Sequence, residues 1–118
     1  SAASSPPGHS NCMKEIKAYI RRNRLDAVIN ALARIEGFSG VSVNTITGFG
    51  RSRGILRLVD FETHIKLETV CHDAMKDRIV ETILASGSTG QRGDGKVFVS
   101  SVSEAYRIEN QEALEEKP

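Results

Sequence analysis

Hydrophobic and polar residues alternate where the folded part of the chain is expected to begin, at Met13. The apolar residues of this first segment are Ile16, Ala18 and Ile20, and their period of two predicts a strand. The spacing then changes to that of an amphipathic helix, with Leu25, Val28, Leu32 and Ile35 on one face. Asn23 is a suitable N-cap for this helix, and Gly37 and Gly40 are expected to end it.

The same two patterns recur further along the chain. A second strand is expected from Val41 to Gly50, followed by a short basic connection, Arg51 to Gly54. A long strand follows, in which one face carries Val59, Phe61, Ile65, Leu67 and Cys71. Asp73 is placed to cap a second helix, whose apolar face contains Met75, Ile79 and Ile83. After a glycine-rich segment, residues 87–95, a fourth strand is expected at Val97 to Val99.

The resulting order, β-α-β-β-α-β, predicts a ferredoxin-like α+β fold. Its antiparallel sheet carries both helices on one face, and the uncovered face is a reason to expect an oligomer. We expect one domain over residues 13–109. Residues 1–12 are small, polar and rich in Pro and Gly, which indicates a disordered tail or an expression remnant, and residues 110–118 are expected to be an acidic flexible tail.

Charge and composition argue against several classes of function. The chain has 16 basic and 15 acidic residues, and a net charge of +1 argues against a general nucleic-acid or membrane-surface binder. No apolar run approaches the ~20 residues that span a bilayer, and the first residues do not form a signal peptide. Cys12 and Cys71 show no disulfide spacing, which fits a reducing compartment. We therefore expect a cytoplasmic protein.

The strongest chemical signal is the segment Thr89 to Lys96. It contains three glycines, whose backbone can turn sharply and present N–H groups to an anion, and two cations, Arg92 and Lys96. It matches G-x-x-x-x-G-K, but Val97 stands where a P-loop needs Ser or Thr, and the segment runs from a helix into a strand rather than the reverse. The choice therefore lies between an anion site and a plain helix-to-strand turn.

A second basic segment lies at Gly48 to Gly54. Arg51 and Arg53 could clamp a phosphate or a carboxylate in bidentate fashion. The alternative interpretation is a solvated hairpin connection.

Taken together, Met13–Ile16, Gly48–Arg51 and Thr89–Val99 resemble the PII nitrogen-regulatory superfamily. The resemblance covers residues 13–109. It implies a homotrimer that binds an adenine nucleotide in three inter-subunit clefts, with no resident cofactor and no enzymatic activity. It also implies that the loop after the second strand, called the T-loop, signals to a partner protein such as a membrane transporter.

The resemblance also implies the residues of the nucleotide site. Gly93 to Lys96 would hold the phosphates, the backbone of Val70 would read the adenine edge, and Arg107 would reach across from the neighbouring subunit. The full set is Gly40, Val41, Ser42, Gly48, Arg51, Val70, Gly90, Arg92, Gly93, Asp94, Gly95, Lys96 and Arg107.

Several positions depart from the family pattern. The T-loop is expected to be very short, between Gly54 and Asp60, and it contains no tyrosine for uridylylation. Ser52 replaces a glutamine, and Glu109 replaces a second arginine, where a carboxylate would repel a triphosphate. ADP, AMP or a cyclic nucleotide is therefore as suitable a ligand as ATP. Short-loop relatives accompany inorganic-carbon systems, which implies bicarbonate as a further effector. His64 replaces a lysine and, with Arg53 and Lys66, could form a second anion site or a T-loop site.

Other function classes fit less well. His64 and His72 would lie about 27 Å apart on one strand at ~3.3 Å per residue, so no intrachain metal site is expected. A metal-tolerance sensor of the same fold is the runner-up function. An RNA-recognition domain would need paired aromatics on its central strands, whereas Lys96–Val99 supplies one. No Ser-His-Asp or Cys-His set can be placed by spacing.

Overall fold

The computed structural model describes residues 12–46, 48–52, 55–59 and 64–114. The chain forms β1 (Met13–Arg21), a short 3-10 turn η1 (Arg22–Arg24), α1 (Leu25–Ala33) and β2 (Ser42–Thr45). It continues through β3 (Gly48–Ser52), β4 (Ile55–Val59), β5 (His64–His72), α2 (Asp73–Gly87) and β6 (Gly95–Val102).

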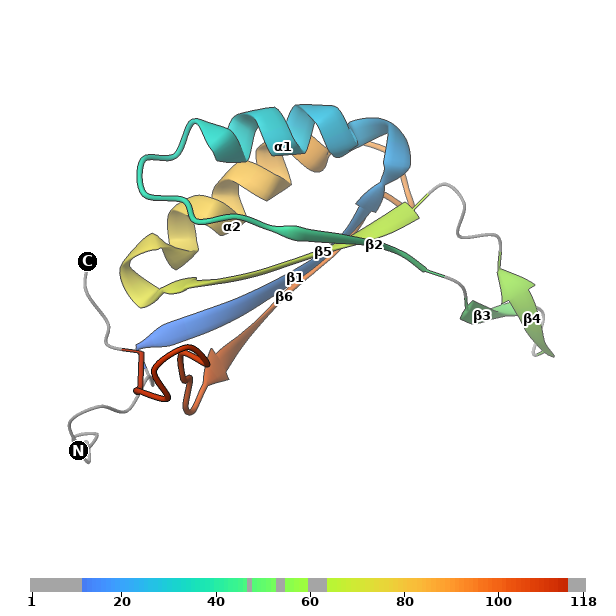
Figure 1. Cartoon of the computed structure of the whole chain (residues 1–118). Helices are drawn as coiled ribbons and strands as arrows, with labels where there is room; N and C mark the ends of the chain where they lie inside the picture. The colour runs from blue at the N-terminus through green and yellow to red at the C-terminus, as the bar shows by residue number, and fades with distance from the viewer. Residues whose placement is uncertain (1–11, 47, 53–54, 60–63, 115–118) are drawn as a thin grey trace, which may run out of the picture.

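The main sheet has the strand order β2-β5-β1-β6, and each neighbouring pair is antiparallel. Both helices cover one face of this sheet (Figure 1). The predicted ferredoxin-like βαββαβ arrangement is therefore confirmed. The opposite face, which we call the open face, carries no helix of the described chain.

The core lies between the sheet and the helices. The alternation predicted for β1 is observed, because Ile16, Ala18 and Ile20 are all buried against the helices. In β5 the buried residues are Ile65, Leu67, Thr69 and Cys71, and the helices contribute Val28, Leu32, Ile79 and Ile83. This packing fixes the register of β1 against β5 and β6, because a shift of one residue would expose every buried side chain.

The segment between β2 and β5 differs from the prediction. The second strand does not run on to Gly50, and the third does not begin near Val59. Instead β3 and β4 pair with each other as a separate two-stranded sheet, with Gly48 opposite Val59 (Figure 1). Strand β5 starts only at His64, so the connection between β2 and β5 covers residues 46–63, and from here on this connection is called the T-loop. The period-two pattern that runs through Val59 does not show which partner the strand pairs with, and Phe61 lies outside the described residues.

Both predicted helix caps are wrong. Residues 22–24 form the 3-10 turn η1, so α1 begins after Asn23, and its N-cap is Arg24. The N-cap of α2 is His72, and Asp73 is the first helical residue. There its carboxylate lies in the first turn, where negative charge interacts favourably with the helix dipole.

The chain after β6 folds back on itself. Tyr106 and Ala113 form an isolated antiparallel bridge, the N–H of Arg107 donates to the Glu112 carbonyl at 2.8 Å, and the N–H of Leu114 donates to the Ala105 carbonyl at 2.8 Å. We call residues 105–114 the C-terminal turn. The predicted domain end at residue 109 falls inside this hydrogen-bonded turn.

Candidate functional site

Residues 88–95, which lead from the end of α2 into the first residue of β6, are called the glycine loop. Gly90, Gly93 and Gly95 all have positive φ angles, of 80°, 83° and 119°. At Gly95 an added Cβ would lie 1.7 Å from the carbonyl oxygen of Tyr19, so no other residue fits against β1 there. The close approach places the loop over the end of β1.

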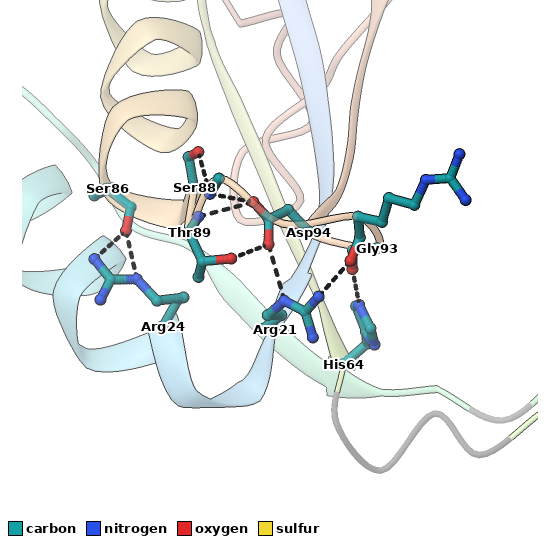
Figure 2. Close-up of polar contacts among 10 residues, drawn as sticks. Arg21, Arg24, His64, Ser86, Ser88, Thr89, Gly93 and Asp94 are labelled. Atoms are coloured by element: carbon teal, nitrogen blue, oxygen red, sulfur yellow. Dashed lines mark hydrogen bonds and ion pairs between the residues drawn. The ribbon is translucent and has the colours of Figure 1, made fainter.

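Asp94 holds the loop in shape. Its Oδ1 accepts hydrogen bonds from the Thr89 hydroxyl and from Nε of Arg21, the latter at 2.9 Å. Its Oδ2 accepts from the backbone N–H groups of Thr89 at 2.8 Å and Gly90 at 3.1 Å (Figure 2). The bonds from Thr89, and then the one from Arg21, hold the pKa of the Asp94 carboxyl well below its usual range. The carboxylate is thus engaged within the loop, and only the backbone of Asp94 is suited to meet a phosphate.

A cleft of about 750 Å³ opens between the glycine loop and the open face of the sheet. Lys96 lies opposite Tyr19 in the β1–β6 ladder, and Phe98 packs edge-to-face against Tyr19, with ring centroids 6.0 Å apart. The cleft therefore combines a cation and loop backbone with an aromatic wall. Its lining residues are Tyr19, Ile46, His64, Gln91, Gly93, Asp94, Gly95, Lys96 and Phe98.

Of the predicted second-anion group, His64 and Lys66 share the open face at the start of β5. His64 lines the cleft and its Nε2 donates to the carbonyl of Gly93 at 2.6 Å. Lys66 instead forms an ion pair with Glu68, with Nζ and Oε1 3.4 Å apart. Arg53 lies outside the described residues. Gly48 and Arg51 belong to β3, where the backbone alone is described.

A second cleft, of about 530 Å³, contains the residues expected near the adenine. Gly40, Val41, Ser42 and Val70 line it together with Glu15, Ser39, Glu68 and Thr69. The buried Thr69 hydroxyl donates to the Gly40 carbonyl at 2.6 Å and ties the start of β2 to β5. Val70 is 41% exposed where it lines this cleft.

Arg107 belongs to the same end of the molecule as this second cleft. It lines a neighbouring cavity of about 240 Å³ with Val70, His72 and Leu114. Its Nη1 lies 3.8 Å from Oε1 of Glu109, and both side chains are more than half exposed. Glu109, which departs from the family pattern, is therefore the ion-pair partner of Arg107, two residues before it in the chain.

The two clefts lie at different positions along β1. Val70 of the second cleft is adjacent to Glu15, whereas Lys96 of the first is adjacent to Tyr19. Four residues of strand separate them by about 13 Å. Within one chain, Gly93 to Lys96 are brought together, and Gly40, Val70 and Arg107 are brought together, but the two groups do not form one pocket.

Metal ligation has no support in the described part of the chain, where no group of three His, Cys, Asp or Glu residues is arranged to hold an ion. His64 and His72 stand at opposite ends of β5. Cys71 is buried, and burial raises the pKa of its thiol.

Comparison with known proteins decides the family. The family model described as "Nitrogen regulatory protein P-II" matches residues 13–112. The chain belongs to the P-II family.

Individual P-II proteins agree with this assignment. The chain is 40% identical to nitrogen regulatory protein P-II of Haemophilus influenzae over 113 residues, which is 86% of this chain and 100% of the relative. It is 42% identical to P-II of Rhodospirillum rubrum over 103 residues, or 81% of this chain and 91% of the relative. Among solved structures, Arabidopsis thaliana PII bound to citrate aligns with a TM-score of 0.71 and 30% identity, covering 89% of this chain and 91% of that one. Like P-II proteins in general, it is a signal-transduction regulator.

The sequence patterns did not predict two features of this P-II site. Arg21, the last residue of β1, contacts both Arg92 and Asp94 of the glycine loop. Tyr19 and Phe98 form the aromatic wall of the first cleft. The only available signal for the wall was that Tyr19 falls on the polar phase of the β1 alternation, and nothing in the spacing pointed to Arg21. No helix of the described residues has the length and apolar character needed to cross a membrane.

Proposed function

We propose that this chain is a homotrimeric P-II regulator that binds an adenine nucleotide between subunits, with ADP or AMP bound at least as tightly as ATP. The observation that carries the proposal is the division of the expected site residues between two places on one chain. Gly93 to Lys96 lie at one end of the open face, and Gly40, Val70 and Arg107 lie at the other.

This division favours a ligand shared between neighbouring subunits. In a ring of three copies, the glycine-loop end of one subunit can meet the Arg107 end of the next, and three such meetings close the ring. Lys96 and the loop backbone would hold the phosphates, while the second cleft would hold the adenine against the Val70 backbone. The open face, with Phe98 53% exposed, would be covered by the other subunits.

The chemistry of the first cleft supports a phosphate ligand. Positive-φ glycines allow successive backbone N–H groups to converge on one anion, and Lys96 adds a mobile positive charge. At the Arg107 end, Glu109 lowers the local positive charge, which disfavours the additional charge of a third phosphate.

The signalling output is proposed to use the T-loop, residues 46–63. The T-loop joins the main sheet at β2 and β5, and β5 begins at His64, which contacts the glycine loop. Ligand binding in the first cleft would therefore change the contacts of His64, at the end of the T-loop. The resemblance adds bicarbonate as a second effector, a membrane transporter as a partner and nitrogen or inorganic-carbon metabolism as the setting.

Calorimetry on the full chain tests the proposal. Titration with ADP, AMP and ATP should give up to one site per subunit, and light scattering should report three subunits. Lys96→Ala should weaken ADP and ATP alike, by about tenfold or more, because a charged hydrogen bond is worth ~1.5–3 kcal/mol. A stable monomer at micromolar concentration, or no heat with any adenine nucleotide, would contradict the proposal. Repeating the ADP titration with added bicarbonate tests the second effector.

A further inference from the structure

Two neighbouring carbonyl groups of the glycine loop are each held by a side chain from the main sheet. Nη2 of Arg21 donates to the Arg92 carbonyl at 2.6 Å, and Nε2 of His64 donates to the Gly93 carbonyl at 2.6 Å (Figure 2). Arg21 is the last residue of β1 and His64 the first of β5, and the two are paired in the ladder. The ends of two adjacent central strands thus hold the loop.

Arg21 makes a second contact that fixes its own position. Its Nε donates to Oδ1 of Asp94 at 2.9 Å, so one guanidinium group bridges the carbonyl of Arg92 and the carboxylate of Asp94, two residues apart in the loop. The fit is close, because a Cβ added at Gly93 would lie 3.4 Å from Nη2 of Arg21. The side chains of Arg21 and Asp94 are only 23% and 22% exposed. This geometry suits the planar fork of arginine and not the single ammonium of lysine.

Holding these carbonyls also orients the N–H groups beside them. A trans peptide is planar, and its N–H points opposite to its C=O. The Arg92 carbonyl shares a peptide with the N–H of Gly93, and the Gly93 carbonyl shares one with the N–H of Asp94. With both carbonyls drawn toward Arg21 and His64, the two successive N–H groups are directed away from these side chains. Consecutive N–H groups fixed in this way form an anion-binding concavity.

We infer that Arg21 and His64 are positioning residues, which orient the Gly93 and Asp94 peptides for a phosphate group without contacting it. The inference rests on the proposed nucleotide site. Without the two side chains, the loop would have to be ordered at the moment of binding, and that ordering would lower affinity. His64 is also the first residue after the T-loop, and its side chain holds the carbonyl of the Gly93–Asp94 peptide. A shift of His64 at the start of β5 would therefore change the orientation of this peptide.

Matched variants separate this role from charge and from general stability. Arg21→Ala and His64→Ala remove the two contacts, whereas Arg21→Lys keeps the charge without the fork and His64→Gln keeps an N–H donor. Arg24→Ala is the control, because Arg24 donates from Nε and Nη2 to the Ser86 carbonyl, at 2.9 and 2.6 Å, at the end of α2 (Figure 2). It loses the same charge and two similar hydrogen bonds beside the loop, but none to the loop peptides.

Calorimetry with ADP is the first measurement. Arg21→Ala and His64→Ala should each weaken ADP binding about tenfold, as loss of one charge-assisted or well-formed hydrogen bond predicts. Arg21→Lys should remain weak, and His64→Gln and Arg24→Ala should stay within about threefold of the parent protein. Equal affinity in Arg21→Ala and the parent, or equal losses in Arg24→Ala and Arg21→Ala, would overturn the inference while leaving the nucleotide site intact.

Hydrogen exchange of the ligand-free proteins is the second measurement. Arg21→Ala and His64→Ala should exchange faster than the parent at residues 89–95, with little change in α2, whereas Arg24→Ala should change the end of α2. Unchanged exchange in the loop would overturn the inference. If the parent protein binds no adenine nucleotide, the proposed function fails, but the exchange experiment still decides whether Arg21 and His64 order the loop.

Discussion

Reversal of the charge at Glu109 should shift the nucleotide preference toward ATP. Glu109 pairs with Arg107 at 3.8 Å, and the two side chains are 55% and 76% exposed, so the pair is screened by solvent and contributes little to folding. Its effect on a bound nucleotide is electrostatic. A change of two charge units at about 6 Å from a phosphate is worth ~1.4 kcal/mol in a medium close to water, and salt reduces this further. Glu109→Arg should therefore tighten ATP binding by about 3- to 10-fold relative to ADP.

Calorimetry with ADP and ATP at two salt concentrations is the appropriate assay, because the gain should shrink as ionic strength rises. Glu109→Gln should give about half the effect in free energy, since it removes one charge unit. Glu112→Arg is a matched control, because it makes the same charge change in the C-terminal turn and keeps the backbone bond from Arg107 to the Glu112 carbonyl. An unmodified protein that already prefers ATP tenfold over ADP, or a Glu109→Arg variant with an unchanged preference, would refute the reasoning.

Three further predictions concern the glycine loop and the core. Gly95→Ala should lower the free energy of unfolding by more than about 2 kcal/mol in urea denaturation, because its Cβ would overlap the Tyr19 carbonyl; a variant as stable as the parent would contradict the close approach. The pKa of Asp94 is lowered by folding, so its contribution to stability is present above the ordinary value of 3.8 and is lost as pH falls below it. The protection factors of the Thr89 and Gly90 amides, measured relative to the unstructured exchange rate at each pH, should therefore hold down to about pH 4 and fall below it, and Asp94→Asn should lower them at neutral pH. Of the two cysteine thiols, exposed Cys12 should react quickly with a disulfide reagent at neutral pH and buried Cys71 slowly, because burial raises the pKa of the Cys71 thiol; two fast reactions would argue against the packing of β5.

The main sheet and its core could be predicted from the sequence because burial there repeats with a simple period. The alternation around Ile16 and Ile65 and the helical spacing of Ile79 and Ile83 correspond to residues that are almost fully buried. The T-loop could not be predicted in the same way. An apolar residue at position 59 continues the period of β5, but strand pairing depends on which segments meet, and Val59 pairs with Gly48 instead.

The candidate site was predictable only in part, for a related reason. Glycines with two cations indicate an anion-binding loop from sequence alone, and the structure brings Gly93, Gly95 and Lys96 together in one cleft. The contribution of Arg21 depends on the register that places it beside His64, which no local pattern contains. The same is true of the pairing between Arg107 and Glu109, which depends on the fold of the C-terminal turn.

Mixing two defective subunits tests the inter-subunit nucleotide site most directly. Lys96→Ala and Arg107→Ala should each weaken ADP binding when present in every subunit. Co-expression of the two variants should restore parent-like affinity in about a quarter of the clefts, since random assembly joins an intact Arg107 end to an intact Lys96 end at that frequency. Recovery of this tight class in the calorimetric titration is the predicted result. If each chain bound its nucleotide alone, every site would keep one of the two substitutions and would bind ADP weakly. A titration that shows no sites of parent-like affinity would therefore contradict the shared site.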